Sequence, residues 1–272
     1  MSQALLEAKQ LAKLIEVDDQ KPLIVAVLNA QEFAQGHIPH SVVFDPSLLS
    51  SQQKPAAGQL PATDSLIQAL QNIGLPSDKT STIVAYDNAG GSVAGRFIWT
   101  LALFGYHNTA LLNGGLKSWQ RSQLSLSTEV NAVTPSTLEL TLDPRFIANK
   151  DDVLASISDE HSIIWDARSA EEYRGEKVLA ARGGHIPGAI SHDWLLLQDE
   201  QECLKPLEQI RTELAQKGID ANKQIITHCQ THRRSGLSWF VAYKLLGFDH
   251  VKAYPGSWSE WGNDEALPIE AP

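Results

Sequence analysis

The feature that most constrains the fold of this 272-residue chain is that its two halves align with each other. Three segments of the first half recur in the second at one offset of 142 positions, and a fourth recurs at an offset of 148. The pairs are Ile83–Asp87 with Ile225–Cys229, Gly105–His107 with Gly247–Asp249, Gly114–Trp119 with Gly256–Trp261, and His37–Ser41 with His185–Ala189. Several matches at one offset indicate a duplicated unit, so we expect two similar domains.

Short β-rich runs alternate with helical patterns in each half. The expected strands are 23–28, 81–86 and 109–112 in the first half and 162–166, 224–228 and 251–254 in the second. The expected helices are 65–73, 93–103 and the amphipathic N-terminal segment 1–17. This alternation predicts an α/β fold in which each domain is a parallel β-sheet flanked by helices. We place the first domain at 1–125, a Ser-, Thr- and Val-rich linker at 126–143 and the second domain at 144–272.

Composition limits the possible partners and the compartment. No apolar stretch is long enough to cross a bilayer, and the N-terminal segment lacks the basic start and continuous apolar block of a signal peptide. The two cysteines, Cys203 and Cys229, imply no disulfide framework, which favours the reducing cytoplasm. A net charge of −10 argues against binding to nucleic acid or to a membrane surface.

We expect the chemistry in the polar loop that follows the predicted strand 224–228. The loop begins at Cys229, contains Arg233 and Arg234, and leads into an amphipathic helix. Backbone N–H groups at a helix N-terminus have no intrahelical partner and attract anions, so a thiol there is shifted toward thiolate. The stretch between Asp220 and Asp249 contains no acidic residue, so this acidic chain carries a local basic window centred on the cysteine. An anionic substrate is therefore predicted.

The first half lacks this equipment. Asp87 stands where the second half has Cys229, and the two-arginine loop corresponds to the uncharged segment 88–92. The segment Asp166–Arg168 corresponds to the apolar residues 26–28. The second half alone is predicted to be catalytic.

These features resemble the tandem-domain rhodanese (thiosulfate sulfurtransferase) family, over nearly the whole chain. Val251–Trp261 fits the C-terminal signature of that family, and His185–Ala189 fits its His-apolar-Pro-Gly-Ala motif. The loop Cys-Gln-Thr-His is similar to that of some bacterial members, whereas the common family loop begins Cys-Arg-Lys-Gly. A second departure is Glu172, which stands where animal members carry an arginine.

The resemblance implies that Cys229 is the nucleophile, which takes a sulfur from a small anionic donor such as thiosulfate and holds it as a persulfide. The sulfur then passes to cyanide or a thiol, with no metal and no organic cofactor. The residues expected to bind the substrate are Arg234, Arg233, Gln230, Thr231, His232 and Ser235. The residues expected to support the loop are Asp166, Arg168 and Trp194, and Gly256 is expected to serve a turn.

Several alternatives stay open or are weighed against this interpretation. The chain is alternatively a 3-mercaptopyruvate sulfurtransferase, or a sulfur-carrier protein that hands its persulfide to an accepting protein. A tyrosine-type phosphatase is disfavoured because its loop has five residues between Cys and Arg, whereas four separate Cys229 from Arg234. A metal site is not expected, because the histidine spacing matches no ligand pattern. Cys203 is interpreted as a structural thiol.

Overall fold

The protein is described by a computed structural model that covers residues 3–17 and 21–271. Two compact units are present. Of the described residues, those of Met1–Leu49, Pro61–Asp143 and Glu200–Cys203 form the first unit, and those of Ser50–Leu60, Pro144–Asp199 and Leu204–Pro272 form the second. A short segment of the N-terminal half, Ser50–Leu60, thus belongs to the second unit, and a short segment of the C-terminal half, Glu200–Cys203, belongs to the first. One boundary in the sequence therefore does not separate the two units. The domain bounds 1–125, 126–143 and 144–272 stay a prediction.

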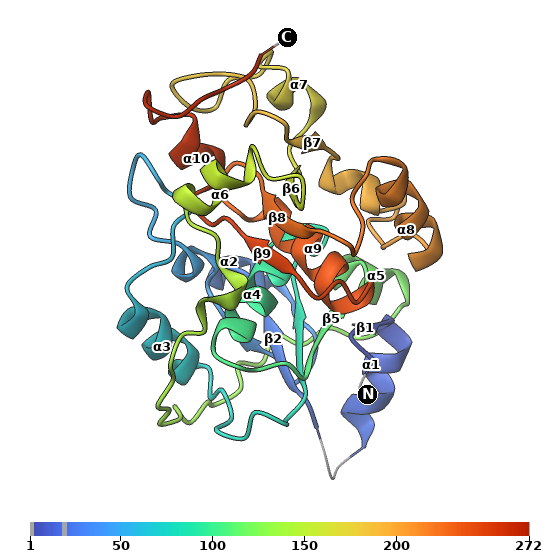
Figure 1. The fold of residues 1–272 in the computed structure, drawn as a ribbon. Coiled ribbons are helices and arrows are strands. Elements are labelled where there is room, and N and C mark those ends of the chain that lie inside the picture. Colours follow the sequence, from blue (N-terminus) through green and yellow to red (C-terminus); the bar gives the residue numbers. More distant parts are fainter. Residues whose placement is uncertain (1–2, 18–20, 272) are drawn as a thin grey trace. The chain divides into compact units, whose positions relative to one another are not determined.

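The first unit is a five-stranded parallel sheet with the strand order β1-β5-β4-β2-β3 (Figure 1). Its strands are β1 (Leu5–Leu6), β2 (Leu23–Ala26), β3 (Val42–Val43), β4 (Ile83–Tyr86) and β5 (Thr109–Leu112). Its helices are α1 (Ala8–Glu16), α2 (Ala30–Gln35), α3 (Thr63–Asn72), α4 (Ser92–Leu103) and α5 (Gly115–Arg121). Its central strands read as continuous apolar runs, because both faces of the sheet are buried.

The second unit is a four-stranded parallel sheet with the order β7-β6-β8-β9 (Figure 1). Its strands are β6 (Ser162–Asp166), β7 (Ile190–Ser191), β8 (Gln224–His228) and β9 (Val251–Ala253). Its helices are α6 (Lys150–Ser156), α7 (Ala170–Tyr173), α8 (Leu207–Gln216), α9 (Arg234–Phe240) and α10 (Ser257–Trp261). A π-helical segment, Val241–Leu245, continues α9.

The topology confirms the predicted fold of two parallel α/β sheets. The order β3-β2-β4-β5 of the first sheet equals the order β7-β6-β8-β9 of the second. Helices α4 and α9 start 142 positions apart, at Ser92 and Arg234, which is the offset found in the sequence. The predicted N-terminal helix is partly wrong: Leu5–Leu6 form β1 beside β5, and the helix itself is Ala8–Glu16. Residues 1 and 2 of that prediction lie outside the described residues.

Each unit has its own apolar core. In the first, side chains of β2, β4 and β5 pack with those of α1, α2 and α5. In the second, side chains of β6 and β8 pack with those of α6 and α10. Among the described residues, no helix is both long enough and apolar enough to span a bilayer.

Candidate active site

Cys229 immediately follows β8, at the carboxyl end of the strand. The strand delivers it there because Ile225 and Ile226 are fully buried and fix the register of β8 between β6 and β9. The thiol residue is only 1% exposed. The polar loop then turns into α9, which begins at Arg234, so the cysteine lies at a helix N-terminus as the sequence predicts.

The surroundings of Cys229 favour its thiolate. Burial raises the pKa of the thiol, but the Arg234 charge and hydrogen bonds from Ser235 and Thr231 lower it more. The net pKa is therefore below the ordinary value of the thiol. The donors include the backbone N–H groups of Thr231 and Ser235, which are the loop amides that a helix N-terminus leaves free.

The same loop in the first unit already holds an anion. Asp87 follows β4 and is 1% exposed. One carboxylate oxygen accepts N–H bonds from Ala89 (2.9 Å) and Gly91 (2.8 Å), and the other accepts from Val93 and Ala94 (2.8 Å each). We call these four donors the amide cradle of the first unit. An internal carboxylate fills it completely, so it has no donor left for a substrate.

The second unit presents two of the four equivalent amides to a sulfur atom. Thr231 and Ser235 lie 142 positions after Ala89 and Val93, two donors of the amide cradle. Their N–H groups bond the Cys229 sulfur in place of a carboxylate. Of the other two equivalents, the Gly236 N–H donates to the Arg233 carbonyl at 3.0 Å, so the second loop does not repeat the four-donor cradle around its sulfur.

Arg234 is the charged group that lowers the pKa of this thiol, and its charge is shared with a carboxylate. Its guanidinium donates to both carboxylate oxygens of Glu172, at 2.6 and 2.8 Å. Glu172 is 2% exposed and comes from α7, 62 positions earlier in the chain. The basic window of the sequence is thus offset by an acidic residue from outside it, which sequence reasoning noticed only as a departure from the family. Arg233, by contrast, is exposed.

Asp166 and Arg168 form a buried ion pair behind the loop. Arg168 donates to both carboxylate oxygens of Asp166, with a shortest distance of 2.6 Å, and also to the Gly184 carbonyl. Burial raises the pKa of Asp166, but His228 and Arg168 lower it below its ordinary value. Burial lowers the pKa of His228, so this histidine is neutral at pH 7. The guanidinium also lies 4.3 Å from the ring centroid of Trp258.

The remaining predicted residues occupy different places around the loop. Gln230 donates to the Leu179 carbonyl (3.0 Å), in an insertion that the first half lacks. His232 is buried with a φ of 57° and bonds the Ser235 hydroxyl at 2.8 Å. Trp194 is half-buried at the start of a 3-10 turn, and its N–H bonds the Ala167 carbonyl at 3.3 Å. The structure therefore brings His232 and Ser235 together, whereas no described contact joins the Trp194 ring to the cysteine.

Two further segments support the loop and were missed from the sequence. The Ser257 hydroxyl accepts the Cys229 N–H at 3.3 Å, and the Trp258 N–H donates to the Cys229 carbonyl at 2.9 Å. The segment Ser50–Leu60 belongs to the second unit, and a Cβ atom on Gly58 would lie 2.8 Å from the Thr231 Cα. A hollow of about 370 Å³ borders the loop; it is lined by Lys54, Pro55, Ala57, Leu179, Ala180, Gln230, Thr231, Ser259 and Asn263.

The prediction that Gly256 serves a turn through dihedral angles that other residues avoid is wrong. Its φ of −57° and ψ of −38° are helical, and any residue adopts them. A Cβ atom there would instead collide with the Glu260 carboxylate and lie 2.8 Å from the Gln59 amide nitrogen. The glycine is needed for space between α10 and the segment Ser50–Leu60.

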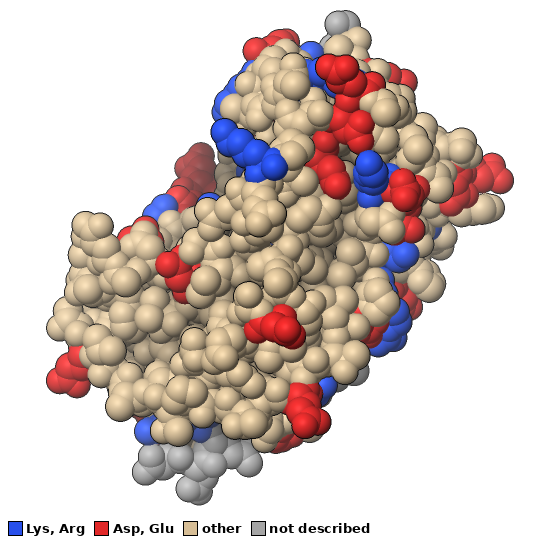
Figure 2. All heavy atoms as spheres, turned by 90° about the vertical axis from the view of Figure 1, so that its left-hand side faces the viewer, with Lys and Arg blue, Asp and Glu red and all other residues tan. Residues whose placement is uncertain are grey.

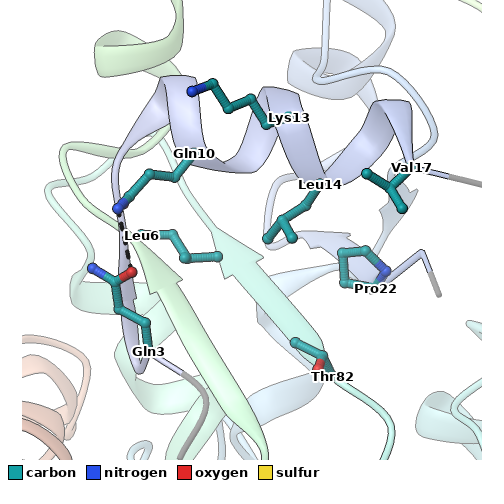
Figure 3. Close-up of a pocket in the computed structure, with 8 residues that line it drawn as sticks. All are labelled: Gln3, Leu6, Gln10, Lys13, Leu14, Val17, Pro22 and Thr82. Carbon is teal, nitrogen blue, oxygen red and sulfur yellow. Dashed lines mark hydrogen bonds between the residues drawn. The ribbon is translucent and has the colours of Figure 1, made fainter.

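A larger hollow of about 570 Å³ lies in the first unit, between α1 and the start of β2 (Figure 3). Its walls are mainly apolar, and a Gln10–Gln3 hydrogen bond of 3.2 Å crosses its rim. The described residues that line it are Gln3, Leu6, Gln10, Lys13, Leu14, Val17, Pro22 and Thr82, which include no nucleophilic thiol and no acid. It does not compete with the cysteine loop as a site of chemistry. Within residues 3–17 and 21–271, no group of three or more His, Cys, Asp or Glu side chains is arranged to hold a metal ion.

Comparisons with known proteins agree with this geometry. The model of the Rhodanese-like domain family matches residues 7–122 and 149–264. A thiosulfate sulfurtransferase of Azotobacter vinelandii is 41% identical over 248 residues, which are 91% of this chain and 90% of that protein. The sulfur carrier protein TtuD of Thermus thermophilus is 32% identical over 261 residues, 90% of each chain.

A 3-mercaptopyruvate sulfurtransferase of Escherichia coli K12 is 32% identical over 244 residues, which are 89% of this chain and 85% of that protein. Among solved structures, an EanB variant in complex with ergothioneine superposes with a TM-score of 0.88 at 24% identity. That match covers 98% of this chain and 70% of that chain, and it shows the fold alone.

Proposed function

This chain belongs to the rhodanese-like family, and we propose that it is a thiosulfate sulfurtransferase with one active site, built on Cys229. The observation that carries the proposal is the contrast between the two loops. In the first unit the Asp87 carboxylate fills the amide cradle, whereas in the second unit a buried thiol of lowered pKa takes its place. A loop that places a reactive sulfur beside the Arg234 guanidinium suits a small anionic sulfur donor.

The first half-reaction loads the enzyme. The Cys229 thiolate attacks the outer sulfur of thiosulfate, a sulfur–sulfur bond forms, and the original sulfur–sulfur bond of thiosulfate breaks. Sulfite leaves with the electron pair of the broken bond, and Cys229 becomes a persulfide whose terminal sulfur carries one negative charge. Thr231, Ser235 and Arg234 donate to the Cys229 sulfur, and we expect the same donors to stabilise the charge of the persulfide.

The second half-reaction returns the thiolate. Cyanide or an acceptor thiolate attacks the terminal sulfur, the persulfide bond breaks, and Cys229 leaves as the thiolate. Cyanide becomes thiocyanate, and a thiol becomes a persulfide. Neither half-reaction transfers electrons to an outside acceptor, so the scheme as written requires no metal and no organic cofactor. Because the two substrates react in separate steps, ping-pong kinetics are expected.

The other residues have supporting roles in this proposal. Arg234 supplies the positive charge, and Arg233, exposed at the start of α9, is a candidate for guiding the donor inward. Asp166 and Arg168 fix the end of β6 beside the loop. Gln230 ties the loop to Leu179 at the edge of the hollow that borders it.

We also propose a cytoplasmic location and small-molecule partners. Both cysteines are free thiols, which suits a reducing compartment. Nucleic acid and membrane surfaces are not expected to bind, because the net charge is −10. On the face drawn in Figure 2, acidic and basic side chains are interspersed among large uncharged areas. A protein that accepts the sulfur is compatible with the scheme, since such an acceptor would also attack through a thiolate.

Two variants test the assignment. Cys229→Ser is expected to abolish sulfite release from thiosulfate, while Cys203→Ser, a matched change of the other free cysteine, is expected to retain it. Turnover by Cys229→Ser would refute the proposed nucleophile. The donor is tested by kcat/KM for thiosulfate and for 3-mercaptopyruvate, with thiosulfate expected to be the better. The reverse order would assign the chain to 3-mercaptopyruvate, and slow turnover of both with a stable persulfide would assign it to sulfur carriage.

A further inference from the structure

Glu172 and Arg234 form a short ion pair beside the cysteine loop. Both terminal nitrogens of the Arg234 guanidinium, Nη1 and Nη2, donate to the two carboxylate oxygens, at 2.6 and 2.8 Å, in a fork-to-fork pairing. Such bidentate pairs fix the plane of the guanidinium as well as its position. Arg234 is 24% exposed at its side chain, whereas Glu172 is 2% exposed. The acid is therefore the anchored partner and the arginine is the one that is held.

Glu172 is itself held by the local structure of α7. Ser169 caps this helix and its hydroxyl accepts the Glu172 N–H at 3.4 Å. Burial raises the pKa of the Glu172 carboxyl, but Arg234 lowers it below the ordinary value, so the carboxylate is charged at neutral pH. The helix is short, so the position of this carboxylate depends on its packing and on Arg234.

Arg234 contacts a second anion, the Cys229 sulfur. Its side chain donates to the sulfur as well as to Glu172. Burial lowers the pKa of Arg234, whereas these two anions raise it, and the net pKa is raised. The local group therefore consists of one cation between two anions. A dianion such as thiosulfate must bind beside Arg234, although the positive charge of Arg234 is already shared by Glu172 and Cys229.

We propose that Glu172 is a positioning and specificity-determining residue: it holds the Arg234 guanidinium against Cys229, and it subtracts one positive charge from the loop that receives the donor. This inference rests on the proposed sulfur transfer. Its physical consequence is that the loop binds dianions less tightly than two arginines would suggest. It therefore releases sulfite, the dianionic product, more readily.

Other charged groups face this pair from neighbouring elements. They are Asp166 and Arg168 at the end of β6, His228 at the end of β8, and Asp193 before the turn Trp194–Leu197. Asp166 and Arg168 pair with each other, and His228 is neutral, so they add little net charge. Burial raises the pKa of Asp193, although Arg234 lowers it in part. Glu172 is thus the carboxylate that directly balances Arg234.

Two variants separate the charge of Glu172 from its reach. Glu172→Gln keeps the length of the side chain and one oxygen that accepts from Arg234, but it removes the charge and the second acceptor, so the positive charge of Arg234 acts more fully on the loop. We expect the pH midpoint of Cys229 alkylation by iodoacetamide to fall. The KM for thiosulfate and the inhibition constant for sulfite should both fall roughly tenfold. Glu172→Asp keeps the charge but is shorter by one methylene, so we expect kcat to fall while KM and the alkylation midpoint change little.

The matched control is Glu171→Gln, the same change at the neighbouring exposed position of α7, which should leave all four quantities unchanged. Equal effects of Glu171→Gln and Glu172→Gln, or an unchanged midpoint and KM in Glu172→Gln, would overturn the charge role. An unchanged kcat in Glu172→Asp would overturn the positioning role. Glu172→Gln tests the charge role and Glu172→Asp tests the positioning role. If one of the two variants does not fold, the other still tests its own role.

Alkylation needs no sulfur donor, which separates this inference from the proposed function. If the wild-type chain does not turn over thiosulfate but Glu172→Gln lowers the alkylation midpoint, the ion pair acts on Cys229 and the function is wrong. If the wild-type chain does turn over thiosulfate and neither variant changes these quantities, the function stands and the inference is wrong.

Discussion

The filled amide cradle of the first unit leads to a prediction about stability. Asp87→Asn changes little in shape, but it replaces one carboxylate oxygen by an NH₂ group. In the wild-type chain each oxygen accepts two backbone N–H bonds of 2.8–2.9 Å. In the variant, two of the four amides face a donor instead of an acceptor, and the other two bond a neutral oxygen.

The magnitude follows from this count. A buried donor without a partner costs about 1–3 kcal/mol. Two such donors therefore predict a loss of about 2–6 kcal/mol in the free energy of opening this region. The two remaining bonds also weaken, since hydrogen bonds to a charged acceptor are roughly twice as strong as neutral ones. A loss of about 3 kcal/mol corresponds to a rise of roughly a hundredfold in the exchange rate of protected amides.

Hydrogen exchange by mass spectrometry, read on peptides covering β4 and α4, measures this effect directly. Asp45→Asn is the control: Asp45 is exposed in the same unit, and its carboxylate accepts the Ser47 N–H at 2.8 Å. Its effect should be below about 1 kcal/mol. If Asp87→Asn accelerates exchange no more than Asp45→Asn does, the carboxylate does not hold the loop and the contrast between the two loops loses its physical basis.

Three further predictions concern the second unit. Alkylation of Cys229 should have a lower pH midpoint than that of an ordinary cysteine thiol, because the folded pKa is lowered; Arg234→Gln should raise that midpoint, and an unchanged midpoint would remove the arginine from the site. Asp166→Asn should lower the free energy of unfolding by about 3–5 kcal/mol in urea, since Arg168 is left buried without its partner. Asp166 has a lowered folded pKa, so the difference between wild type and variant should persist at pH 7 and shrink only below about pH 4. A difference that vanishes at pH 7 would contradict this. Gly58→Ala should lower kcat/KM for thiosulfate by roughly tenfold, because the added Cβ lies 2.8 Å from the Thr231 backbone; unchanged kinetics would show that the segment Ser50–Leu60 does not constrain the loop.

The fold could be predicted from local sequence patterns because the same pattern of strands and helices occurs in both halves of the chain. The predicted strand 224–228 coincides with β8, and 109–112 coincides with β5. The error at Leu5–Leu6 has a physical cause: two apolar residues fit a helix face or a strand equally well, and pairing with β5 decides the outcome. Local patterns also could not predict that Ser50–Leu60 belongs to the second unit, because this depends on contacts between residues far apart in the sequence.

The parts of the site that are close to Cys229 in the sequence were predictable, whereas partners from distant parts of the chain were not. The position of Cys229 at a strand end and helix start follows from the sequence around it. The partner of Arg234 does not, because Glu172 lies 62 positions away and only the fold brings it near. Gly256 was predicted for its dihedral freedom, whereas its role is to leave space for side chains from other elements. Tertiary contacts of this kind have no signature in a single sequence.

The central claim is that Cys229 carries the sulfur between donor and acceptor. Intact mass spectrometry of the protein mixed with thiosulfate, before and after cyanide, tests it most directly. A gain of about 32 Da, one sulfur atom, is expected on the peptide containing Cys229, and it should disappear with cyanide as thiocyanate forms. A gain on Cys203, or turnover of thiosulfate without any sulfur on Cys229, would contradict it.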